Sequence, residues 1–361
     1  MKTVVVGMSG GVDSSVAALL LKRSGYDVIG LFMHNWEEEE GGACTAAEDW
    51  ADVRAVCGRI GIPHYSINFS KEYGERVFAH FLDEYAKGRT PNPDVLCNRE
   101  IKFGVFRDYA LRLGSAVATG HYCDIDTYCS QPVLLKAKDE SKDQTYFLCD
   151  TRTEQLNDVM FPLGKLDKSE VRKIATENGL ITSGKKDSTG ICFIGERKFR
   201  AFLSEYLPAK PGKIIDTNGR EIGEHVGLMY YTLGQRRGLG IGGVKGEAQQ
   251  RWYVVDKNLK DNVLVVSCGE GEELLSYGLK TEGFNFIGKV DYPQEFRCTA
   301  KFRYRQGEQG VTVKMDGNIA TIKFDEPQRA VTPGQYAVLY DGNRCLGGGV
   351  INKAFAHPIE L

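Results

Sequence analysis

Cys97 lies in a polar stretch in which a thiol could do chemistry. Residues 90–99 contain two prolines, and the acidic Asp94 and the basic Arg99 flank the cysteine. The prolines are expected to hold the stretch as a rigid loop. A carboxylate on that loop could act as a general acid or base, and a guanidinium could lower the pKa of the thiol. A proline-stiffened connection with an incidental cysteine explains the same residues equally well.

Cys192 lies in a second polar stretch, residues 185–195, with two lysines, an Asp-Ser-Thr cluster and glycines on both sides of the cysteine. The lysines favour the thiolate, although a capping turn beside a buried cysteine is an equally good interpretation. If the fold brings Cys97 and Cys192 together, they suit thiol chemistry that passes through a disulfide. None of the ten cysteines forms a Cys-x-x-Cys pair, so a zinc site is not expected.

A glycine-rich turn near the start of the chain predicts an anion site. A strand is predicted over residues 3–8, and a helix is predicted directly after the Ser-Gly-Gly turn at 9–11. Free backbone N–H groups at a helix N-terminus bind phosphate, and glycines permit close approach. Asp13 could hold Mg²⁺, and Ser14 and Ser15 add hydroxyl groups. No lysine follows the glycines, so this is not the phosphate loop of ordinary NTPases. A plain capped turn is the alternative.

Residues 297–305 have the clearest charge pattern in the chain. If they form one strand, the four basic residues share one face with Thr299, and apolar side chains occupy the other face. Because no acidic residue interrupts this basic strip, we favour contact with a nucleic-acid backbone over an edge strand protected by charge. Residues 139–146 and 234–243 could contact a substrate and phosphate, respectively. A solvated helix start explains the first slightly better, and a mobile loop explains the second equally well.

The elements that would position these residues begin as an alternation of strands and helices. We predict strands over 3–8, 27–33, 64–69 and 115–119, and helices over 12–24, 45–60, 70–87 and 100–113. This order predicts a mainly parallel sheet with helices on both faces. Ligands bind beyond the carboxyl ends of such strands, which is where residues 9–15, Met33 and Gly120 lie.

The second half of the chain changes character. Residues 150–207 are predicted to be mostly helical, and 208–212 form a proline-containing linker. Beyond it the apolar period changes from about 3.6 residues to about 2. Short strands are then predicted over 213–216, 250–256, 262–267, 297–305, 311–315, 318–324 and 335–340. We expect three domains: an α/β catalytic domain at 1–209, a small β domain at 210–277 and a C-terminal β-barrel at 278–361.

The composition excludes a general affinity for nucleic acid. The chain has 361 residues and a formal net charge of −2, so any RNA site must be a local patch. The sequence contains no signal-peptide pattern and no apolar run near the ~20 residues that a membrane span needs. We therefore expect a soluble, cytoplasmic protein.

These motifs together resemble one enzyme family. Residues 9–14, Ser-Gly-Gly-Val-Asp-Ser, resemble the PP-loop of the ATP pyrophosphatases, which adenylate a substrate and release pyrophosphate. The stretches around Cys97 and Cys192 and the run at 234–243 are similar to those of the bacterial tRNA-specific 2-thiouridylases (the MnmA/TrmU family). The resemblance extends over essentially the whole chain. It implies a PP-loop sheet domain, of the adenine nucleotide alpha hydrolase-like type, followed by two small β domains.

The resemblance also implies a reaction, the 2-thiolation of the wobble uridine, position 34, of tRNA. ATP and Mg²⁺ would adenylate the carbon-2 oxygen, and sulfur transfer would give 2-thiouridine, AMP and pyrophosphate. Cys192 resembles the cysteine that carries a persulfide. Cys97 resembles its partner nucleophile, with which it forms a transient disulfide, and Asp94 resembles the acid/base residue.

The family implies two further sets of residues and several partners. The ATP site is expected at Gly7, Met8, Ser9, Gly10, Gly11, Val12, Asp13, Ser14, Met33 and Gly120. Contacts with tRNA are expected from Asn92, Pro93, Asp94, His121, Lys142, Asp143, Gln144, Arg303, Tyr304 and Gln335. The expected partners are the tRNAs for Lys, Glu and Gln and a sulfur-relay protein or cysteine desulfurase. The chain is expected to be a monomer.

Two alternative functions remain open at this point. A PP-loop ligase that adenylates a small molecule for amidation needs no thiol, so it would keep its activity without Cys97 and Cys192. A non-catalytic RNA-binding or redox protein would not convert ATP to AMP in a tRNA-dependent manner.

Overall fold

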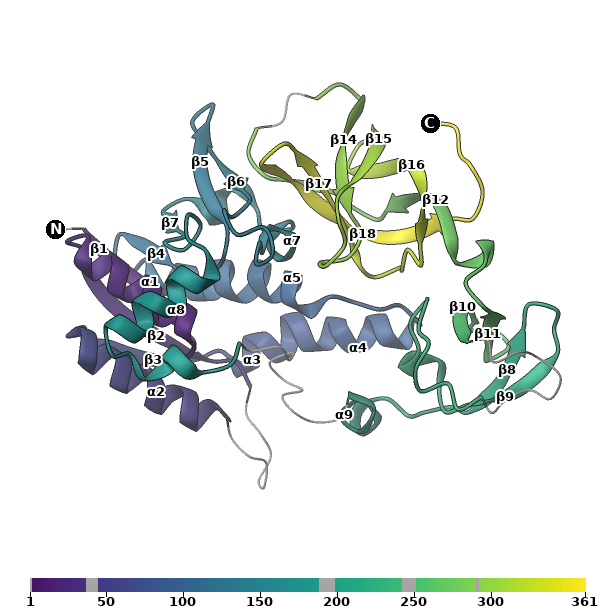
Figure 1. Cartoon of the computed structure of the whole chain (residues 1–361), viewed down its shortest axis with the longest axis horizontal. Coiled ribbons are helices and arrows are strands. Elements are labelled where there is room, and N and C mark those ends of the chain that lie inside the picture. The colour runs from purple at the N-terminus through teal and green to yellow at the C-terminus, as the bar shows by residue number, and fades with distance from the viewer. Residues whose placement is uncertain (1, 37–44, 188–198, 242–250, 290–291) are drawn as a thin grey trace.

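The computed structural model describes residues 2–36, 45–187, 199–241, 251–289 and 292–361 (Figure 1). Within these ranges the strands form three sheets. Figure 1 shows the N-terminal sheet on the left, the C-terminal barrel at the upper right and the central sheet at the lower right. The predicted order of a parallel sheet followed by two β units, the last one a barrel, is confirmed. The predicted domain limits at 209/210 and 277/278 stay predictions.

The N-terminal sheet is parallel and has five strands in the order β3-β2-β1-β4-β7. They are β1 (Thr3–Met8), β2 (Asp27–His34), β3 (His64–Asn68), β4 (Ala116–Ala118) and β7 (Val159–Met160). The first four match the predicted strands to within two residues at either end. The fifth lies in the region predicted to be mostly helical, and the sequence pattern missed it.

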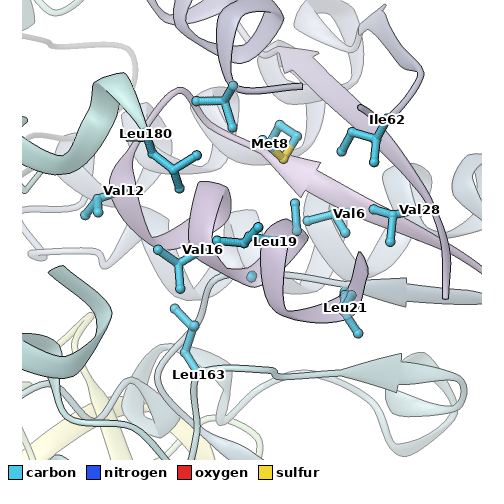
Figure 2. Packing of buried hydrophobic residues seen from close by; sticks show 14 of the residues in the cluster. Val6, Met8, Val12, Val16, Leu19, Leu21, Val28, Ile62, Leu163 and Leu180 are labelled. Atoms are coloured by element: carbon cyan, nitrogen blue, oxygen red, sulfur yellow. The ribbon is translucent and has the colours of Figure 1, made fainter. Parts of the chain in front are cut away.

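Alternate residues of β1 pack against opposite layers of helices, as strand geometry requires. Val4 and Val6 belong to the apolar cluster formed with α1 (Val12–Arg23), α2 (Thr45–Ile60) and α8 (Lys168–Glu177), part of which Figure 2 shows. Val5 faces the other way and packs with Phe106. Because both faces of β1 are buried, its carboxyl end and the turn that follows are held in a fixed position.

The remaining helices are short, and two of them have π geometry. They are α3 (Ser70–Tyr73), η1 (Gly74–Phe78, π), α4 (Ala79–Ala86), α5 (Pro93–Cys97), η2 (Asn98–Phe106, π), α6 (Arg107–Ala110), α7 (Thr145–Leu148), η3 (Thr153–Leu156), η4 (Ile181–Gly184) and α9 (Phe199–Tyr206). The helix predicted over 70–87 is confirmed as the continuous run from α3 to α4.

The helix predicted over 100–113 begins earlier, so the expectation that Asp94 and Cys97 lie on a loop is wrong. Pro93 occupies the first position of α5, where a missing N–H costs nothing. The Asn92 side chain accepts a hydrogen bond from the Asp94 N–H at 3.2 Å and so caps this helix. Both chemically interesting side chains therefore lie within the first five residues of a helix.

The central sheet has the strand order β10-β11-β8-β9. Its strands are β8 (Gly212–Asp216), β9 (Glu221–His225), β10 (Trp252–Asn258) and β11 (Val263–Cys268), with the short helix η5 (Leu228–Tyr230) after β9. The sequence pattern predicted all of these strands except β9.

The C-terminal unit is a closed barrel of six strands. They follow the order β12-β16-β15-β14-β17-β18, and β18 pairs with β12 to close the circle. Their bounds are β12 (Leu275–Thr281), β14 (Glu295–Lys301), β15 (Gln309–Asp316), β16 (Ile319–Arg329), β17 (Tyr336–Asp341) and β18 (Arg344–Phe355), and η6 (Glu272–Leu274) and β13 (Asn285–Phe286) are attached to them. The sequence pattern missed β12, β13 and β18.

A hairpin from the N-terminal half joins the barrel sheet. It consists of β5 (Asp124–Tyr128) and β6 (Gln131–Leu135), and β6 pairs with β18. The N-terminal half of the chain and the C-terminal barrel therefore share a sheet, which the sequence pattern did not predict. No helix in the described ranges is long and apolar enough to cross a membrane.

Candidate active site

The glycine-rich turn after β1 leaves a helix N-terminus open. Gly11 precedes α1 with extended backbone, and no side chain caps that end of the helix. Instead, the Ser14 and Ser15 hydroxyl groups donate to the Gly11 carbonyl at 3.2 and 2.7 Å and fix the turn. Ser14 Oγ also accepts the Ser9 N–H at 3.1 Å. The first N–H groups of α1 are thus available to an anion.

Two glycines permit the close packing of this turn. Gly10 has φ +72°, and a Cβ there would lie 2.7–2.9 Å from the backbone and Cβ of Asp49. A Cβ on Gly120 would lie 2.8 Å from Asp13 C and Ser14 N, so the chain after β4 lies directly against the start of α1. The sequence placed both glycines in one site, and the structure brings them together.

Other residues of the predicted ATP site contribute backbone more than side chains. The Met8 and Val12 side chains are buried in the apolar core. Gly7 lies against Phe106, whose Cζ would be 3.3 Å from an added Cβ. Met33 is half-buried and follows Phe32, the β2 partner of Met8, at the same edge of the sheet.

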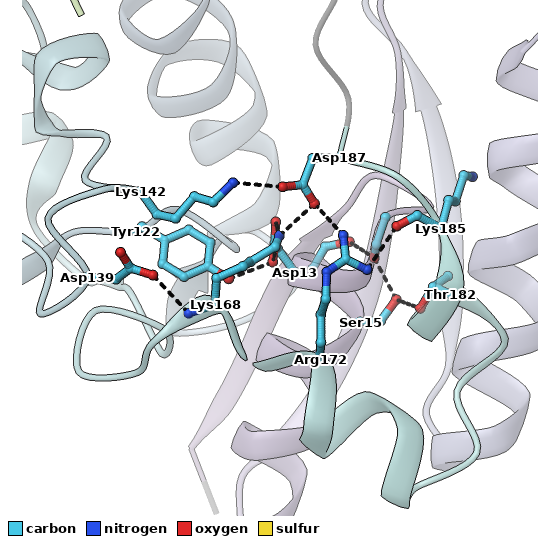
Figure 3. Close-up of polar contacts among 12 residues, drawn as sticks. Asp13, Ser15, Tyr122, Asp139, Lys142, Lys168, Arg172, Thr182, Lys185 and Asp187 are labelled. Carbon is cyan, nitrogen blue, oxygen red and sulfur yellow. Dashed lines mark hydrogen bonds and ion pairs between the residues drawn. The ribbon is translucent and has the colours of Figure 1, made fainter. Parts of the chain in front are cut away.

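A cluster of cations surrounds the turn, and sequence reasoning had not identified its centre. Lys168 Nζ lies 2.7 and 2.8 Å from the two carboxylate oxygens of Asp13 and 2.9 Å from Asp187 (Figure 3). Arg172 and Lys142 also bind Asp187, at 2.8 and 2.9 Å. Burial alone would raise the pKa of Asp187, but its hydrogen bonds and charge interactions with the lysines lower it to about 2.

Lys185 ties the start of the Cys192 stretch to the turn. Its Nζ donates to the Gly10 carbonyl at 3.1 Å and binds Asp49 and Asp52, each at 2.6 Å. The proposed role of this lysine, to favour a thiolate, is therefore not supported, because two carboxylates already neutralise it. Its side chain instead holds the segment beside the anion site.

Asp13 has a donor set that fits Mg²⁺ only in combination with phosphate. Its carboxylate accepts a hydrogen bond from the Tyr122 hydroxyl at 2.8 Å in addition to Lys168. Within the described ranges no three His, Cys, Asp or Glu side chains are grouped to hold a metal. Mg²⁺ is commonly bound by one or two carboxylates together with substrate phosphates. Asp13 would therefore be the protein ligand once Mg²⁺ replaced the Lys168 ammonium at its carboxylate.

Cys97 lies in an apolar environment at the end of α5. Its exposed fraction is 3%, and it belongs to a cluster with Phe81 and with Phe202 of α9. Arg99 was expected to lower its pKa, but the guanidinium is bound to Glu100 at 2.7 Å and Asp150 at 2.5 Å. Two carboxylates therefore compete for the positive charge of Arg99, and its effect on the pKa of Cys97 stays a prediction.

Asp94 reaches solvent from the first turn of α5. The surrounding protein nevertheless raises the pKa of its carboxyl group above the ordinary value, and Lys102 partly opposes this. Such a group keeps its proton to a higher pH than a fully solvated aspartate, which suits acid/base work.

Cys192, and with it the predicted disulfide to Cys97, lies outside the described residues. The structure does describe both sides of the segment 188–198. Asp187 is held by the cation cluster at the turn. Phe199, at the start of α9, packs against Tyr85, with ring centroids 5.5 Å apart, in the region of Cys97.

Several residues predicted to contact tRNA have internal partners. Asp143 is only 5% exposed and accepts hydrogen bonds from Ala137 N and Thr145 Oγ1, so its side chain is structural. Gln144 accepts the Tyr122 N–H at 3.0 Å and positions that tyrosine. The Lys142 side chain is 38% exposed and lies beside Asp187.

His121 directly follows Gly120, which lies against the start of α1. Its Nδ1 lies 2.8 Å from Thr119 Oγ1, and its ring packs beside Phe103. Burial, with a further contribution from Lys102, holds its pKa well below the usual value, so the ring is neutral at physiological pH.

The basic strip predicted over 297–305 is not a continuous surface. The strand β14 ends at Lys301, because the chain turns at Phe302. The Arg303 guanidinium points inward and donates to the Leu233 and Ala330 carbonyls and to Thr332. Acidic residues from outside the strip also contact it: Asp325 of β16 pairs with Arg297 at 2.6 Å, and Glu308 accepts a hydrogen bond from Thr299 at 2.6 Å.

The other predicted barrel contacts lie at the boundary with the N-terminal half. Tyr304 packs on Phe147 with ring centroids 4.3 Å apart. Gln335 donates to the Thr90 carbonyl at 2.8 Å, just before the capped start of α5, whose Asn92 is half-buried and whose Pro93 is buried. These residues connect the barrel with the helix α5.

Replacing Lys168 with methionine should weaken ATP binding by about 10- to 100-fold, because a charged hydrogen bond contributes about 1.5–3 kcal/mol. The change would also leave Asp13 and Asp187 without this cation next to the incoming phosphates. Equilibrium binding of ATP measures the effect. Lys173→Met is the matched control, since Lys173 lies on the same helix, is 74% exposed and pairs with Glu177 alone among the described residues. Equal affinities of the two variants would contradict the assignment.

Comparisons with known proteins cover nearly the whole chain. Three family descriptions match consecutive parts: tRNA methyl transferase HUP domain at 2–196, tRNA methyl transferase PRC-barrel domain at 200–268 and aminomethyltransferase beta-barrel domain at 276–351. A protein named tRNA-specific 2-thiouridylase MnmA from Alkaliphilus oremlandii is 58% identical over 355 residues, which are 97% of each chain. The MnmA of Streptococcus sanguinis is 58% identical over 358 residues, 98% of this chain and 95% of its own.

Solved structures are more distant. The U34-tRNA thiolase NcsA from Methanococcus maripaludis matches 56% of this chain and 63% of its own, at 20% identity and a TM-score of 0.36. A likeness at this level adds nothing to the assignment.

Proposed function

Because this chain belongs to the tRNA-specific 2-thiouridylase family, its activity is the ATP-dependent 2-thiolation of tRNA, and we propose that it thiolates the wobble uridine at position 34 by adenylation and sulfur transfer. One observation carries the mechanism. Asp187 lies in the cation cluster at the anion-binding turn, and Phe199, the first described residue after the stretch that contains Cys192, packs against the apolar cluster of Cys97. The described residues on either side of Cys192 thus support a reaction that uses both the turn and Cys97.

The turn at residues 9–15 supports binding of the triphosphate. The open N-terminus of α1 offers N–H groups, and Gly10 and Gly120 permit the close packing that forms this turn. Lys168 and Arg172 supply positive charge at the same place. Mg²⁺·ATP would supply the adenylyl group, with Asp13 as the metal's protein ligand.

The sulfur step uses two cysteines and balances without an external oxidant. We propose that Cys192 carries a persulfide, whose outer sulfur replaces the activated oxygen on carbon 2 while AMP leaves. The Cys97 thiolate bonds to the Cys192 sulfur and the sulfur–sulfur bond of the persulfide breaks, either before the attack, which frees sulfide, or after it. Either order ends in a Cys97–Cys192 disulfide, which an external thiol must reduce before the next cycle.

The apolar position of Cys97 and the raised pKa of Asp94 fit this scheme. A thiol sheltered from water is protected against unwanted oxidation, and a carboxyl group with a raised pKa is protonated up to a higher pH than an ordinary aspartate. His121, neutral and packed beside Phe103, would face the flipped-out uridine.

The expected partners are those that the family resemblance implies. We propose the tRNAs for Lys, Glu and Gln as substrates, a sulfur-relay protein or cysteine desulfurase as donor, and a monomer acting in the cytoplasm, where tRNA and ATP are present.

Conversion of ATP to AMP and pyrophosphate should require tRNA. Transcripts with cytidine in place of uridine 34 should give no thiolated product, and thiolation of another uridine would refute the position.

The pH dependence should report Asp94. The surroundings of Asp94 raise the pKa of its carboxyl group above the ordinary value of 3.8. In a plot of rate against pH, the limb that reports this group should therefore have its midpoint above pH 3.8. Lys102→Met removes the cation that lowers this pKa and should move the limb to higher pH. Single-turnover rates over a pH series measure it, and Asp94→Asn should remove the limb altogether. A limb that stays in place in Lys102→Met would show that it belongs to another group.

A further inference from the structure

The barrel holds both ends of the segment that carries Asp94 and Cys97. We propose that, besides any contact with tRNA, barrel residues 333–336 act as a clamp that positions the catalytic helix α5. Tyr336 works through Asp150 and Arg99 at one end of the segment, and Gln335 works at the other end. This inference rests on the proposed function, since that function gives Asp94 and Cys97 their roles.

The N-terminal end of the segment is fixed by main-chain contacts. The Thr90 N–H donates to the Pro333 carbonyl at 3.0 Å, and the Thr90 carbonyl accepts from Gln335 Nε2 at 2.8 Å. Gly334, with φ +94°, lies so close to Thr90 that a Cβ would meet its backbone at 2.9 Å. Any side chain at Gly334 would push the barrel away from the approach to α5.

The C-terminal end is fixed by a chain of three side chains. The Tyr336 hydroxyl donates to Asp150 Oδ2 at 3.2 Å, and the same oxygen accepts from Arg99 Nη1 at 2.5 Å. Arg99 lies two residues after Cys97. Its own carbonyl accepts from Gln155 Nε2 at 2.8 Å, so both its main chain and its side chain are held.

Asp150 needs both of these donors because it is buried, with an exposed fraction of 8%. Burial raises the pKa of Asp150, and Arg99 and Tyr336 oppose that effect. When a buried carboxylate loses one hydrogen-bond donor, its negative charge is poorly compensated. The remaining donor is then drawn into a new position. That partner is Arg99, so the disturbance reaches the helix of Cys97.

The local helix geometry explains why this site needs such support. The π-helical segment η2 begins at Asn98, directly after Cys97, and Gly104 within it has non-helical angles. A π segment has i→i+5 hydrogen bonds in place of the i→i+4 bonds of an α-helix, and such segments occur frequently at functional sites. The clamp holds this irregular part of the helix from the side of the barrel.

The test compares two tyrosines of the same strand, both buried. Tyr336→Phe removes the hydroxyl that binds Asp150, whereas Tyr340→Phe removes a hydroxyl that lies 3.3 Å from Thr145 Oγ1. Since small misplacements of reacting groups cost up to about 100-fold in rate, we expect a tenfold or larger drop in the single-turnover rate of Tyr336→Phe. Its dissociation constant for tRNA should stay within about twofold, and Tyr340→Phe should keep its rate.

A second variant and a second readout keep the inference open to refutation. Gln335→Ala loosens the other end and should lower the rate in the same way, even if Tyr336→Phe folds poorly. Alkylation of Cys97 by iodoacetamide, followed by peptide mapping, needs no activity and should be several-fold faster in Tyr336→Phe than in Tyr340→Phe. Unchanged rates and alkylation in both variants, or a loss confined to tRNA affinity, would overturn the clamp. Failure of the unmodified protein to form 2-thiouridine would instead refute the proposed function.

Discussion

Cys97→Ala should lower the rate of 2-thiouridine formation by about 10³-fold or more, because removal of a nucleophile that works as a unit with a second group abolishes the unit. The variant should still bind ATP and tRNA, since Cys97 is buried and belongs to a different apolar cluster from Met8 and Val12 at the anion-binding turn. Single-turnover assays with nucleoside analysis measure the rate, and separate binding assays measure the two affinities.

Cys57→Ala is the matched control for the loss of a buried sulfur. Cys57 is fully buried on α2, and burial raises the pKa of its thiol to about 11, so it stays protonated. Both variants lose a similar buried volume and should lose similar stability. If Cys97→Ala keeps the rate of Cys57→Ala, Cys97 has no part in sulfur transfer.

Gly10→Ala should reduce ATP affinity by about 100-fold or more. A side chain at φ +72° is strained, and the added Cβ would lie 2.7 Å from the Asp49 carbonyl oxygen, which as backbone cannot move aside. The turn must therefore shift away from the start of α1, and each charged hydrogen bond lost to a phosphate costs about 1.5–3 kcal/mol. Calorimetric titration with ATP measures the loss.

Gly25→Ala separates the strain from the close contact. Gly25 has φ +85°, similar to that of Gly10, but nothing lies within 4 Å of an added Cβ. This control should lose stability and keep its affinity for ATP. Equal affinity of the Gly10 and Gly25 variants would show that the phosphates are not bound at this turn.

The parts of the site that local sequence determines were predictable. A buried β-branched strand followed by Gly10 and Gly11 and an apolar helix predicts its own geometry, because each feature depends on neighbours in the chain. Four strands of the barrel, β14 to β17, were predictable for the same reason, since an apolar period of about two indicates strands wherever they pair. The pattern missed β12 and β18, whose pairing closes the barrel. The start of α5 was predictable in principle from Asn92 and Pro93, a cap followed by proline at the first position.

The parts that long-range packing determines were not predictable. Lys168 lies at the start of α8 and reaches Asp13 only because the fold brings that helix beside α1. Arg303 was assigned to a solvent-facing strip, but β14 ends before it and the barrel provides carbonyl partners inside. Asp325, which neutralises Arg297, comes from another strand. The residue pattern within one helix or strand contains no information on partners that come from other elements.

The most direct test of the central claim is nucleoside analysis of tRNA after reaction. The purified chain is incubated with ATP, Mg²⁺, a sulfide source and unmodified tRNA, and the digested tRNA is analysed by mass spectrometry. We predict 2-thiouridine at position 34, one AMP for each sulfur incorporated, and no product when ATP is omitted. Consumption of ATP without any thiolated nucleoside, or a product that forms without ATP, would contradict the account.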